Sequence, residues 1–569
     1  MLATAGVVTV AFAIWWMRQP PVDGRPIAGH STNTAAPRQV VLLVTVDGLR
    51  ADSLGTGETP AIDRLAAAGT RFTRAYAAAP LTLPSHASLF TGGDPPPPRA
   101  RAAGPRTRAA RATLATRLRE AGFVTAAFVS SATLAPRFGL DEGFDRYQAP
   151  AHGWRDAATT VDAALAWLAA QHATRAFLWV HLGFTRGAAA PEPANTEAGP
   201  DVSGGEPGVR EADRHVARLL DTVAAGQPGA VTVLAGSHGL AMGDHDEARH
   251  GLFVYDSTLH VPLVIAGPGV PAGRDLDNPV GLVDVAPTVL GLLGMPPLEA
   301  DGLDLSKALV GEQDVPGRDL YAESYAPLVC CGWAPTRSVR SGRWKFIEAP
   351  RPELYDLTSY PLEQENDVAR WPREVARFGT ASLPLAFGLH AGGAAQAGLG
   401  DGPRPRVPGR DGPRADPKDR RAAWAQLAAI EAGVVEAGEA VRRLQRLVRE
   451  DPGNGLAHQL LGEALAREGD CAGAERHLRA AIAAPVPSAA PYLALAACLD
   501  AAGHRAAAQA VVSAARKVDP GHPGVEAWLG RLAFEQGRPG GAVDALPAAR
   551  RADPALHDGR PSLARALPR

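Results

Sequence analysis

Apolar runs and amphipathic stretches alternate along the first two thirds of the chain. Residues 40–46, the continuous β-branched run VVLLVTV, are typical of a strand buried on both faces. Further strands are predicted at residues 123–129, 177–181, 231–235, 262–265 and 344–348. Helical patterns alternate with these strands at residues 60–69, 113–121, 159–171, 211–223 and 283–293. The alternation predicts an α/β fold, with a mostly parallel sheet flanked by helices.

The last part of the chain has a longer period. Gly469, Gly503 and Gly537 recur every 34 residues, each at an expected turn between two helices. Three further sets follow the same period: Asp451, Asp519 and Asp553, each before a proline and with one unit skipped; Leu460, Ala494 and Trp528; and Gly462, Ala496 and Gly530. This spacing resembles tetratricopeptide repeats. It predicts an all-α domain over residues 419–569 that docks a protein or peptide.

Two biased segments interrupt these patterns. Residues 386–418 are rich in Gly, Pro and Arg without a hydrophobic period, which predicts a disordered linker. Residues 99–119 contain seven arginines and no acid, directly after the prolines at 95–98. A solvated loop that runs into a helix is favoured over a phosphate- or membrane-binding patch, because no aromatic residues interleave.

The N-terminus predicts export or anchoring. Residues 2–16 carry no charge, and Arg18 follows them. The stretch is short for a membrane span and lacks a basic start, but the polar tether to residue 38 gives a buried helix nothing to pack against. We expect a signal or membrane anchor over 1–18 and a tether over 19–38. The bulk of the chain would then lie in the cell envelope, outside the cytoplasmic membrane.

Overall charge and cysteine content exclude little. The formal net charge of −2 gives no reason to expect a nucleic-acid partner. The four cysteines are Cys330, Cys331, Cys471 and Cys498, and none forms a CxxC pair. Cys471 and Cys498 could meet across neighbouring helices, although reduced, buried cysteines are the favoured interpretation.

The candidate chemistry is scattered over two strand ends and one turn. Asp47 ends the first predicted strand, and Ser237-His238-Gly239 follow another. The stretch LTLPSHASLFTG (81–92) holds Thr82; taken alone, Thr-Leu-Pro-Ser is ordinary turn and helix-cap chemistry. Carboxylate and imidazole groups at strand ends can hold a divalent cation, and a hydroxyl beside that cation becomes a usable nucleophile.

These pieces have a common explanation in a known family. Residues 40–367 resemble the sulfatase family of the alkaline phosphatase superfamily, which implies a sulfatase-like domain over 39–385 with a mixed, mostly parallel sheet. The matching segments, in order, are VTVDGLRADSLG, TPAIDRLAAAGTRFTRAYAAAPLTLPSHASLFTG, LREAGFVTAAFVSSATLAPRFGLDEGFDRY, HGLFVYDSTLHVPLVIAGPGV, LVDVAPTVLGLLGM and RSGRWKFIEAPRPELYDL. A sulfatase domain joined to tetratricopeptide repeats is a known bacterial arrangement.

The resemblance implies a role for each position that matches. Asp47 and His238 would be ligands of one divalent metal ion, either Mn, Zn, Ca or Mg. Thr82 falls at the nucleophile position, which the family usually fills with a cysteine or serine that becomes formylglycine. Threonine cannot become formylglycine because its β-carbon bears a methyl group, so the plain hydroxyl would react, as in the phosphodiesterase and phosphotransferase branches. His86 replaces the arginine of the motif.

Two further positions match, and three segments depart. Lys345 occupies the place of a substrate-binding lysine, and His250 matches a site histidine. Ser237 stands where the family has a metal-binding aspartate, so that ligand position is degenerate. The Asp-Pro-His that relatives carry shortly after the strand ending at His181 is replaced by Gly-Phe-Thr-Arg. The His-Gly-Val-Arg-like segment expected after the nucleophile helix is replaced by the prolines at 95–98 and the arginine run.

Two functions follow from this pattern. The first is a metal-dependent hydrolase or transferase of sulfate or phosphate esters, with Thr82 as nucleophile. The second is a catalytically impaired protein of sulfatase fold that serves as an interaction module through its repeats. A nucleotide-dependent enzyme is not supported, because the sequence has no glycine-rich phosphate loop.

Overall fold

The computed structural model describes residues 39–95, 112–150, 153–183, 206–227, 229–378, 414–484 and 488–535. The predicted N-terminal anchor and tether, most of the arginine-rich segment and nearly all of the linker lie outside these ranges. Within them, no helix is both long and apolar enough to cross a membrane.

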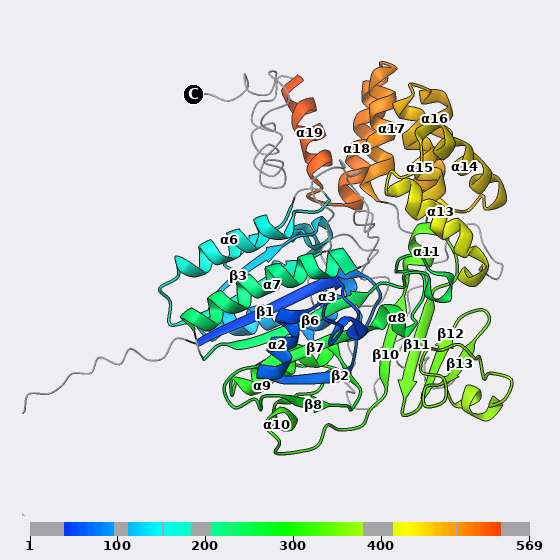
Figure 1. Cartoon of the computed structure of the whole chain (residues 1–569). Coiled ribbons are helices and arrows are strands. Elements are labelled where there is room, and N and C mark those ends of the chain that lie inside the picture. The colour runs from blue at the N-terminus through cyan, green and yellow to red at the C-terminus, as the bar shows by residue number, and fades with distance from the viewer. Residues whose placement is uncertain are drawn as a thin grey trace, which may run out of the picture. The chain divides into compact units, whose positions relative to one another are not determined.

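A nine-stranded sheet forms the centre of the first domain (Figure 1). Its strands are β1 (Gln39–Gly48), β2 (Thr70–Tyr76), β3 (Val124–Val129), β4 (Arg146–Gln148), β5 (Arg175–Leu182), β6 (Val231–Gly239), β7 (His260–Ala266), β8 (Arg274–Leu276) and β9 (Val280–Gly281). The order is β4-β3-β5-β1-β6-β7-β2-β8, and β9 pairs with β2. Only β7 runs antiparallel to its neighbours in the described sheet. The predicted mostly parallel sheet is therefore confirmed.

Helices cover both faces of this sheet. They are α2 (Pro60–Ala68), α3 (Thr82–Thr91), α5 (Leu114–Glu120), α6 (Ala157–Ala169), α7 (Glu206–Gly226), α8 (Asp256–Leu259), α9 (Val285–Leu292) and α10 (Ser306–Leu309). Alternate residues of β1 face opposite sides, as the strand period requires. Val40 and Leu42 pack with residues of α2, α6 and α7, whereas Val41 and Leu43 pack with residues of α3, α5 and α9. Central strand β1 thus lies between two apolar cores.

A smaller antiparallel sheet follows in the chain. Its strands are β10 (Leu320–Ser324), β11 (Thr336–Ser341), β12 (Trp344–Glu348) and β13 (Glu353–Asp356), paired in that order, with α11 (Ala326–Cys331) between the first two. Of these strands, the sequence pattern predicted only β12. The other three are short and mix polar with apolar residues, so they lack the continuous apolar run that marks a strand buried on both faces.

The C-terminal region is helical where the structure describes it. Its helices are α13 (Arg421–Glu431), α14 (Ala437–Glu450), α15 (Gly455–Arg467), α16 (Cys471–Ile482), α17 (Ala489–Ala501), α18 (Arg505–Val518) and α19 (Pro523–Glu535). Every second helix starts 34 residues after its counterpart, from α13 to α15, α17 and α19. Gly469 and Gly503 end their helices with positive φ angles of 86° and 81°, which glycine adopts without strain. The period therefore begins with α13, one unit before the first glycine of the series.

The expectation of reduced cysteines is wrong for this structure. Cys471 and Cys498 form a disulfide between α16 and α17, with their Cα atoms 5.3 Å apart. Cys330 and Cys331 form a second disulfide, so none of the four thiols is free. The two helices pack directly against each other, and this brings residues 27 positions apart within disulfide distance.

One apolar core joins the sheet to the first C-terminal helices. Leu427, Leu444 and Leu461 belong to the same buried cluster as the α3 side of the sheet. Trp333 Nε1 adds a polar contact, since it donates a 2.6 Å hydrogen bond to Asp451 Oδ2. Helices α13–α15 are therefore part of the core that stabilises the first domain.

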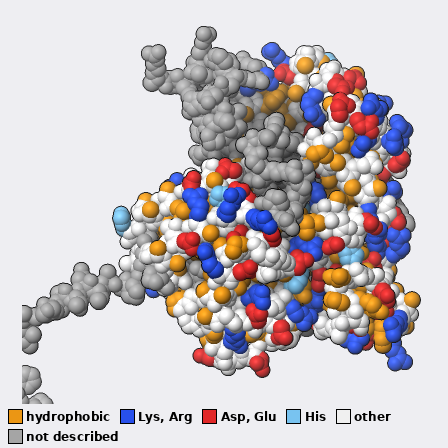
Figure 2. Space-filling model, in the orientation of Figure 1, with side chains coloured by type: hydrophobic (Ala, Val, Ile, Leu, Met, Phe, Trp, Pro, Cys, Tyr) orange, Lys and Arg blue, Asp and Glu red, His pale blue; other side chains and the backbone are white. Residues whose placement is uncertain are grey.

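Charged side chains are mixed over the surface. Figure 2 shows Lys and Arg interspersed with Asp and Glu on the face in view, rather than gathered in one stripe. That face offers no extended basic surface of the kind that nucleic acids select.

We expect Leu461→Ala to destabilise the sheet and the first helices together. Leu461 is fully buried in the shared core, so the cavity should lower the free energy of unfolding by about 2–5 kcal/mol. Urea unfolding followed by tryptophan fluorescence and far-UV circular dichroism measures this. Val434→Ala is the control, because Val434 is 59% exposed. Loss of C-terminal helicity alone, with an unchanged sheet transition, would contradict the shared core.

Candidate active site

Asp47 lies at the carboxyl end of β1, where two neighbouring strands also end. Val46 pairs with Gly236 but Asp47 pairs with His238, so Ser237 is an extra residue in β6. Such a bulge redirects side chains locally. It brings Ser237 and His238 together beside the Asp47 carboxylate.

Thr82 faces this carboxylate from the first turn of α3. Its Oγ1 donates a 2.7 Å hydrogen bond to Asp47 Oδ2 and lies 3.4 Å from His238 Nε2. The helix cap is Leu81, which makes no side-chain capping bond. The Thr82 hydroxyl is thus used by the site and not by the helix end.

Ser237 and His238 complete the side of β6. Ser237 Oγ donates a very short hydrogen bond to Asp47 Oδ1, and His238 Nε2 lies 3.7 Å from the same oxygen. His238 Nδ1 is 2.9 Å from Gly239 O; because a carbonyl oxygen only accepts, this nitrogen carries the proton. In the neutral ring, Nε2 therefore has a free lone pair on the side of Thr82.

His250 is placed against His238. The two rings lie 4.3 Å apart between centroids, and His250 Nδ1 bonds to Pro80 O at 3.0 Å. Burial, with the nearby His238, holds the pKa of His250 well below its usual value. His250 is therefore a neutral ring at the edge of the site.

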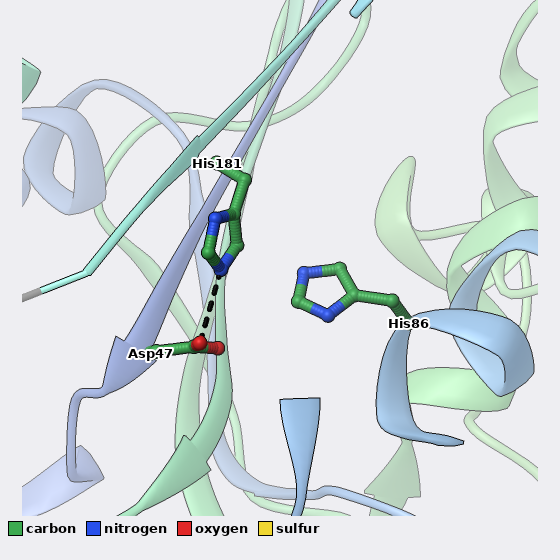
Figure 3. Close-up of side chains that lie close together, drawn as sticks. All are labelled: Asp47, His86 and His181. Carbon is green, nitrogen blue, oxygen red and sulfur yellow. Dashed lines mark ion pairs between the residues drawn. The ribbon is translucent and has the colours of Figure 1, made fainter. Parts of the chain in front are cut away.

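Two more histidines, His86 and His181, lie close to Asp47 (Figure 3). His181, at the end of β5, has Nε2 3.1 Å from Asp47 Oδ2. His86, on α3, comes close enough that one ligand atom each from Asp47, His86 and His181 lie within 4.8 Å of one another. In the described part of the chain, this is the only group of three or more such residues compatible with a metal ion.

Hydrogen bonds fix the protonation of His86. Its Nδ1 donates to Thr82 O at 2.7 Å, and its Nε2 lies 2.9 Å from Thr45 Oγ1. Trp179 Nε1 donates to the same hydroxyl oxygen at 3.0 Å, so the Thr45 proton is free to point at His86. Burial and the neighbouring His181 lower the pKa of His86 to about 3. A neutral imidazole in this position is a good metal ligand.

Asp47 remains ionised among these groups. Burial would raise the pKa of Asp47, but His181, His238 and His86 lower it further, so it is held well below its usual value. The site therefore has one buried negative charge surrounded by imidazoles and hydroxyls.

Lys345 is not part of this group. Its ammonium is buried between Asp256 Oδ1 at 2.7 Å and Glu363 Oε1 at 2.6 Å. Asp256 also accepts a short hydrogen bond from Arg340. Together these residues form a buried ion network beside a cavity of about 50 Å³ lined by Tyr76, Asp256, Arg340 and Lys345, among others. A role for Lys345 in substrate binding stays a prediction.

The sequence pattern brought together Asp47, Thr82, His238 and Ser237 but missed His181 and Thr45. His181 was visible only as the last residue of a predicted strand. The missing information was the strand order: β1 pairs with β5, with Thr45 opposite His181. Since Asp47 follows two residues later, all three side chains are directed to the α3 face.

The comparisons with known proteins agree with this fold. The sulfatase family model matches residues 39–295. This segment of the chain is therefore similar to sulfatase family domains.

The matches to curated relatives cover only part of each relative's length. Human arylsulfatase K is 30% identical over 155 residues, which are 25% of this chain and 28% of that protein. Choline-sulfatase from Rhizobium meliloti is 34% identical over 176 residues, 28% of this chain and 31% of the relative. The chain thus spans less than a third of each of these two relatives.

Solved structures extend the likeness to 62% of this chain. A 2-O GAG sulfatase has a TM-score of 0.51 at 19% identity and covers 62% of this chain and 92% of its own. A phosphonate monoester hydrolase from Silicibacter pomeroyi has a TM-score of 0.50 at 20% identity, with 62% and 96% covered. The alkaline-phosphatase-like sulfatase fold is therefore confirmed.

Glu247 is a buried carboxyl group in the loop between His238 and His250. Its Oε1 accepts a 2.7 Å hydrogen bond from Leu252 N, whereas Oε2 is buried without a partner among the described residues. Burial raises the pKa of Glu247 to about 8. The folded protein therefore keeps this group protonated at neutral pH.

In the wild type, Glu247 makes the protein less stable as the pH rises, and we expect Glu247→Gln to abolish this effect. The raised pKa means that the folded state binds a proton that the unfolded state releases, so the free energy of unfolding falls between about pH 4.5 and pH 8. The amide should relieve this cost, on the order of several kcal/mol at pH 8 and little at pH 4.5. Urea unfolding at both pH values measures it. Glu468→Gln, an exposed site, is the control; equal pH slopes in the wild type and Glu247→Gln would contradict the assignment.

Proposed function

We propose that this chain hydrolyses or transfers sulfate or phosphate esters with Thr82 as the nucleophile. The observation that carries the proposal is the position of Thr82 Oγ1, 2.7 Å from Asp47 Oδ2 and 3.4 Å from His238 Nε2. A hydroxyl held between a carboxylate and an unprotonated imidazole nitrogen is oriented and has a base beside it.

Asp47 and His238 have separate roles in the transfer of the Thr82 proton. Asp47 stays ionised and accepts the hydrogen bond that orients Thr82. As Oγ1 forms its bond to the sulfur or phosphorus, the hydroxyl hydrogen turns from Asp47 Oδ2 and passes to His238 Nε2, which lies 3.4 Å from Oγ1. The ester oxygen then leaves with that proton. A water molecule next attacks the sulfur or phosphorus bound to Thr82 and gives its proton to His238 Nε2. The bond to Oγ1 breaks, and Thr82 takes that proton back. Gly239 O holds His238 in the required tautomer throughout.

Asp47, His86 and His181 would hold the divalent metal. The fit rests on the donor set, one carboxylate with two imidazoles, and on the buried His181 Nε2, which lies 3.1 Å from Asp47 Oδ2. An imidazole-rich set of this kind suits Zn²⁺ better than Ca²⁺ or Mg²⁺. When bound, such an ion polarises the ester oxygens and favours the alkoxide form of a neighbouring hydroxyl.

The relatives support the ester class. The names of arylsulfatase K and choline-sulfatase indicate that these relatives act on sulfate esters. A solved structure of the same fold is a phosphonate monoester hydrolase. Within that class, we propose His250 as a residue that contacts the ester, since it lies at the edge of the site beside His238.

The C-terminal helices are proposed to be tetratricopeptide repeats that dock a protein or peptide. The 34-residue spacing of helix starts supports this. Gly462 supports it as well, because a Cβ there would lie 2.6 Å from Leu478 Cγ, so the small residue permits α15 and α16 to pack closely.

We also propose a location in the cell envelope, with the bulk outside the cytoplasmic membrane and contact to the membrane through the N-terminal segment. The apolar residues 2–16 motivate it. The two disulfides add support, because disulfides persist in oxidising compartments.

We expect Thr82→Val to abolish turnover without loss of the fold. Valine keeps the shape but removes the hydroxyl, so kcat/KM on aryl sulfates or on phosphate mono- and diesters should fall by about 10³-fold or more. Thr82→Ser is the matched control and should retain measurable turnover. Equal turnover in Thr82→Val would overturn the nucleophile. Absence of both metal and turnover in the wild type would favour the catalytically impaired alternative.

We expect His181→Ala to weaken metal binding. Loss of one of three ligands should lower the affinity for Zn²⁺ by at least about 10-fold, as measured by competition with a chromophoric chelator. His172→Ala is the control, because His172 is exposed and outside the site. Unchanged affinity in His181→Ala would show that the metal is held elsewhere.

A further inference from the structure

The site is closed to solvent in this structure. Thr82 is 2% exposed, His238 is 2% exposed and Asp47 is 5% exposed. No ester can reach Thr82 Oγ1 in this conformation. Access therefore requires that a covering segment move.

The loop from Met242 to Gly251 is the segment in the right place. It follows His238 in the chain and contains His250 near its end, where the His250 ring lies against the His238 ring. Gly251 also meets Leu81, the neighbour of Thr82, since a Cβ at Gly251 would be 3.1 Å from Leu81 Cδ2. Displacing the loop would uncover both His238 and the start of α3.

The same loop has a strained backbone. Met242, His245 and Asp246 have positive φ angles of 51°, 55° and 58°, in a region that residues with a Cβ adopt at a cost. Strain at three non-glycine positions within five residues persists only where surrounding contacts hold it. The loop is therefore biased towards release.

The end of the loop is held by the hydrogen bonds of His250 to Pro80 O and of Ser324 to Gly251 O, and three further contacts hold its middle part. Asp244 pairs with Arg50 at 2.8 Å, and the His245 ring stacks on Tyr255 with centroids 3.6 Å apart. The third comes from the C-terminal helices: Arg421 Nη1 of α13 pairs with Asp246 Oδ2 at 2.9 Å.

Helix α13 also lies against the far end of the loop. Trp424 Cζ2 would be 3.6 Å from a Cβ at Gly251, and the Arg421 guanidinium lies 5.6 Å from the centre of the Phe253 ring. This contact is incompletely satisfied, because Arg421 Nε and Trp424 Nε1 are buried without an acceptor among the described residues. Two unpaired N–H groups weaken the closed arrangement, so α13 can release the loop.

We propose that the loop Met242–Gly251 is a lid over Thr82 and that α13, the first helix of the C-terminal region, is its latch. Release of the Arg421–Asp246 pair lets the strained loop relax, which moves His250 off His238 and opens the site. The latch belongs to the helical region, so a partner that shifts α13 would change access to the site. The lid concerns access to Thr82 and does not depend on the reaction proposed above.

The test is the rate at which Thr82→Cys reacts with iodoacetamide in the full chain. All four natural cysteines are paired in disulfides, so without reductant the introduced thiol is the one that reacts. Thr56→Cys, at an exposed site, gives the unprotected rate. We expect Thr82→Cys to react at least about 100-fold more slowly than Thr56→Cys.

Adding Arg421→Ala to Thr82→Cys should raise its rate about 2- to 5-fold, the range that an exposed ion pair supports, and Asp246→Ala should have the same effect without adding to it. Arg64→Ala is the matched control, because it breaks an exposed pair with Asp221 remote from the loop; a Thr56→Cys/Arg421→Ala chain controls for general loosening. Reaction of Thr82→Cys at the Thr56→Cys rate would overturn the lid. An unchanged rate on adding Arg421→Ala would overturn the latch. No ester or metal enters the assay, so its failure leaves the proposed reaction standing, and failure of the reaction leaves the lid standing.

Discussion

The buried charge of Asp47 is the constraint on which the rest of the site depends. A carboxylate that is only 5% exposed is costly unless its charge is matched by donors. Thr82 donates a hydrogen bond to Oδ2 and Ser237 donates one to Oδ1, while His181 Nε2 lies 3.1 Å from Oδ2. Burial alone would raise the pKa of Asp47, but the neighbouring His181, His238 and His86 lower it below its usual value.

The fold supplies those donors from separate parts of the chain. Strands β5, β1 and β6 are neighbours and parallel, so His181, Asp47 and His238 end at the same edge of the sheet. The extra residue in β6 is what allows Ser237 to reach Asp47 while His238 faces Thr82. A β6 strand in regular register would direct only one of these two side chains to that face.

Much of this arrangement could be predicted from the sequence, but not all of it. Buried parallel strands such as β1 show as continuous apolar runs, and Asp47 and His238 were placed at strand ends for that reason. His181 was not recognised as a neighbour of Asp47, because adjacency of β1 and β5 is a property of strand order and leaves no local signal. The disulfide of Cys471 with Cys498 was missed on similar grounds, since it depends on how α16 packs on α17.

The two departures from the family motif are best understood together. Relative to the family, Ser237 removes a negative charge and His86 removes a positive one, so their combined charge is unchanged. The structure satisfies each replacement by hydrogen bonds: Ser237 to Asp47, and His86 to Thr45 and to the Thr82 carbonyl. An anionic ester would therefore meet neutral hydroxyl and imidazole groups at these two positions, in place of an aspartate and an arginine. Seen this way, Ser237 is one half of a compensated exchange, which argues against reading it alone as decay of the site.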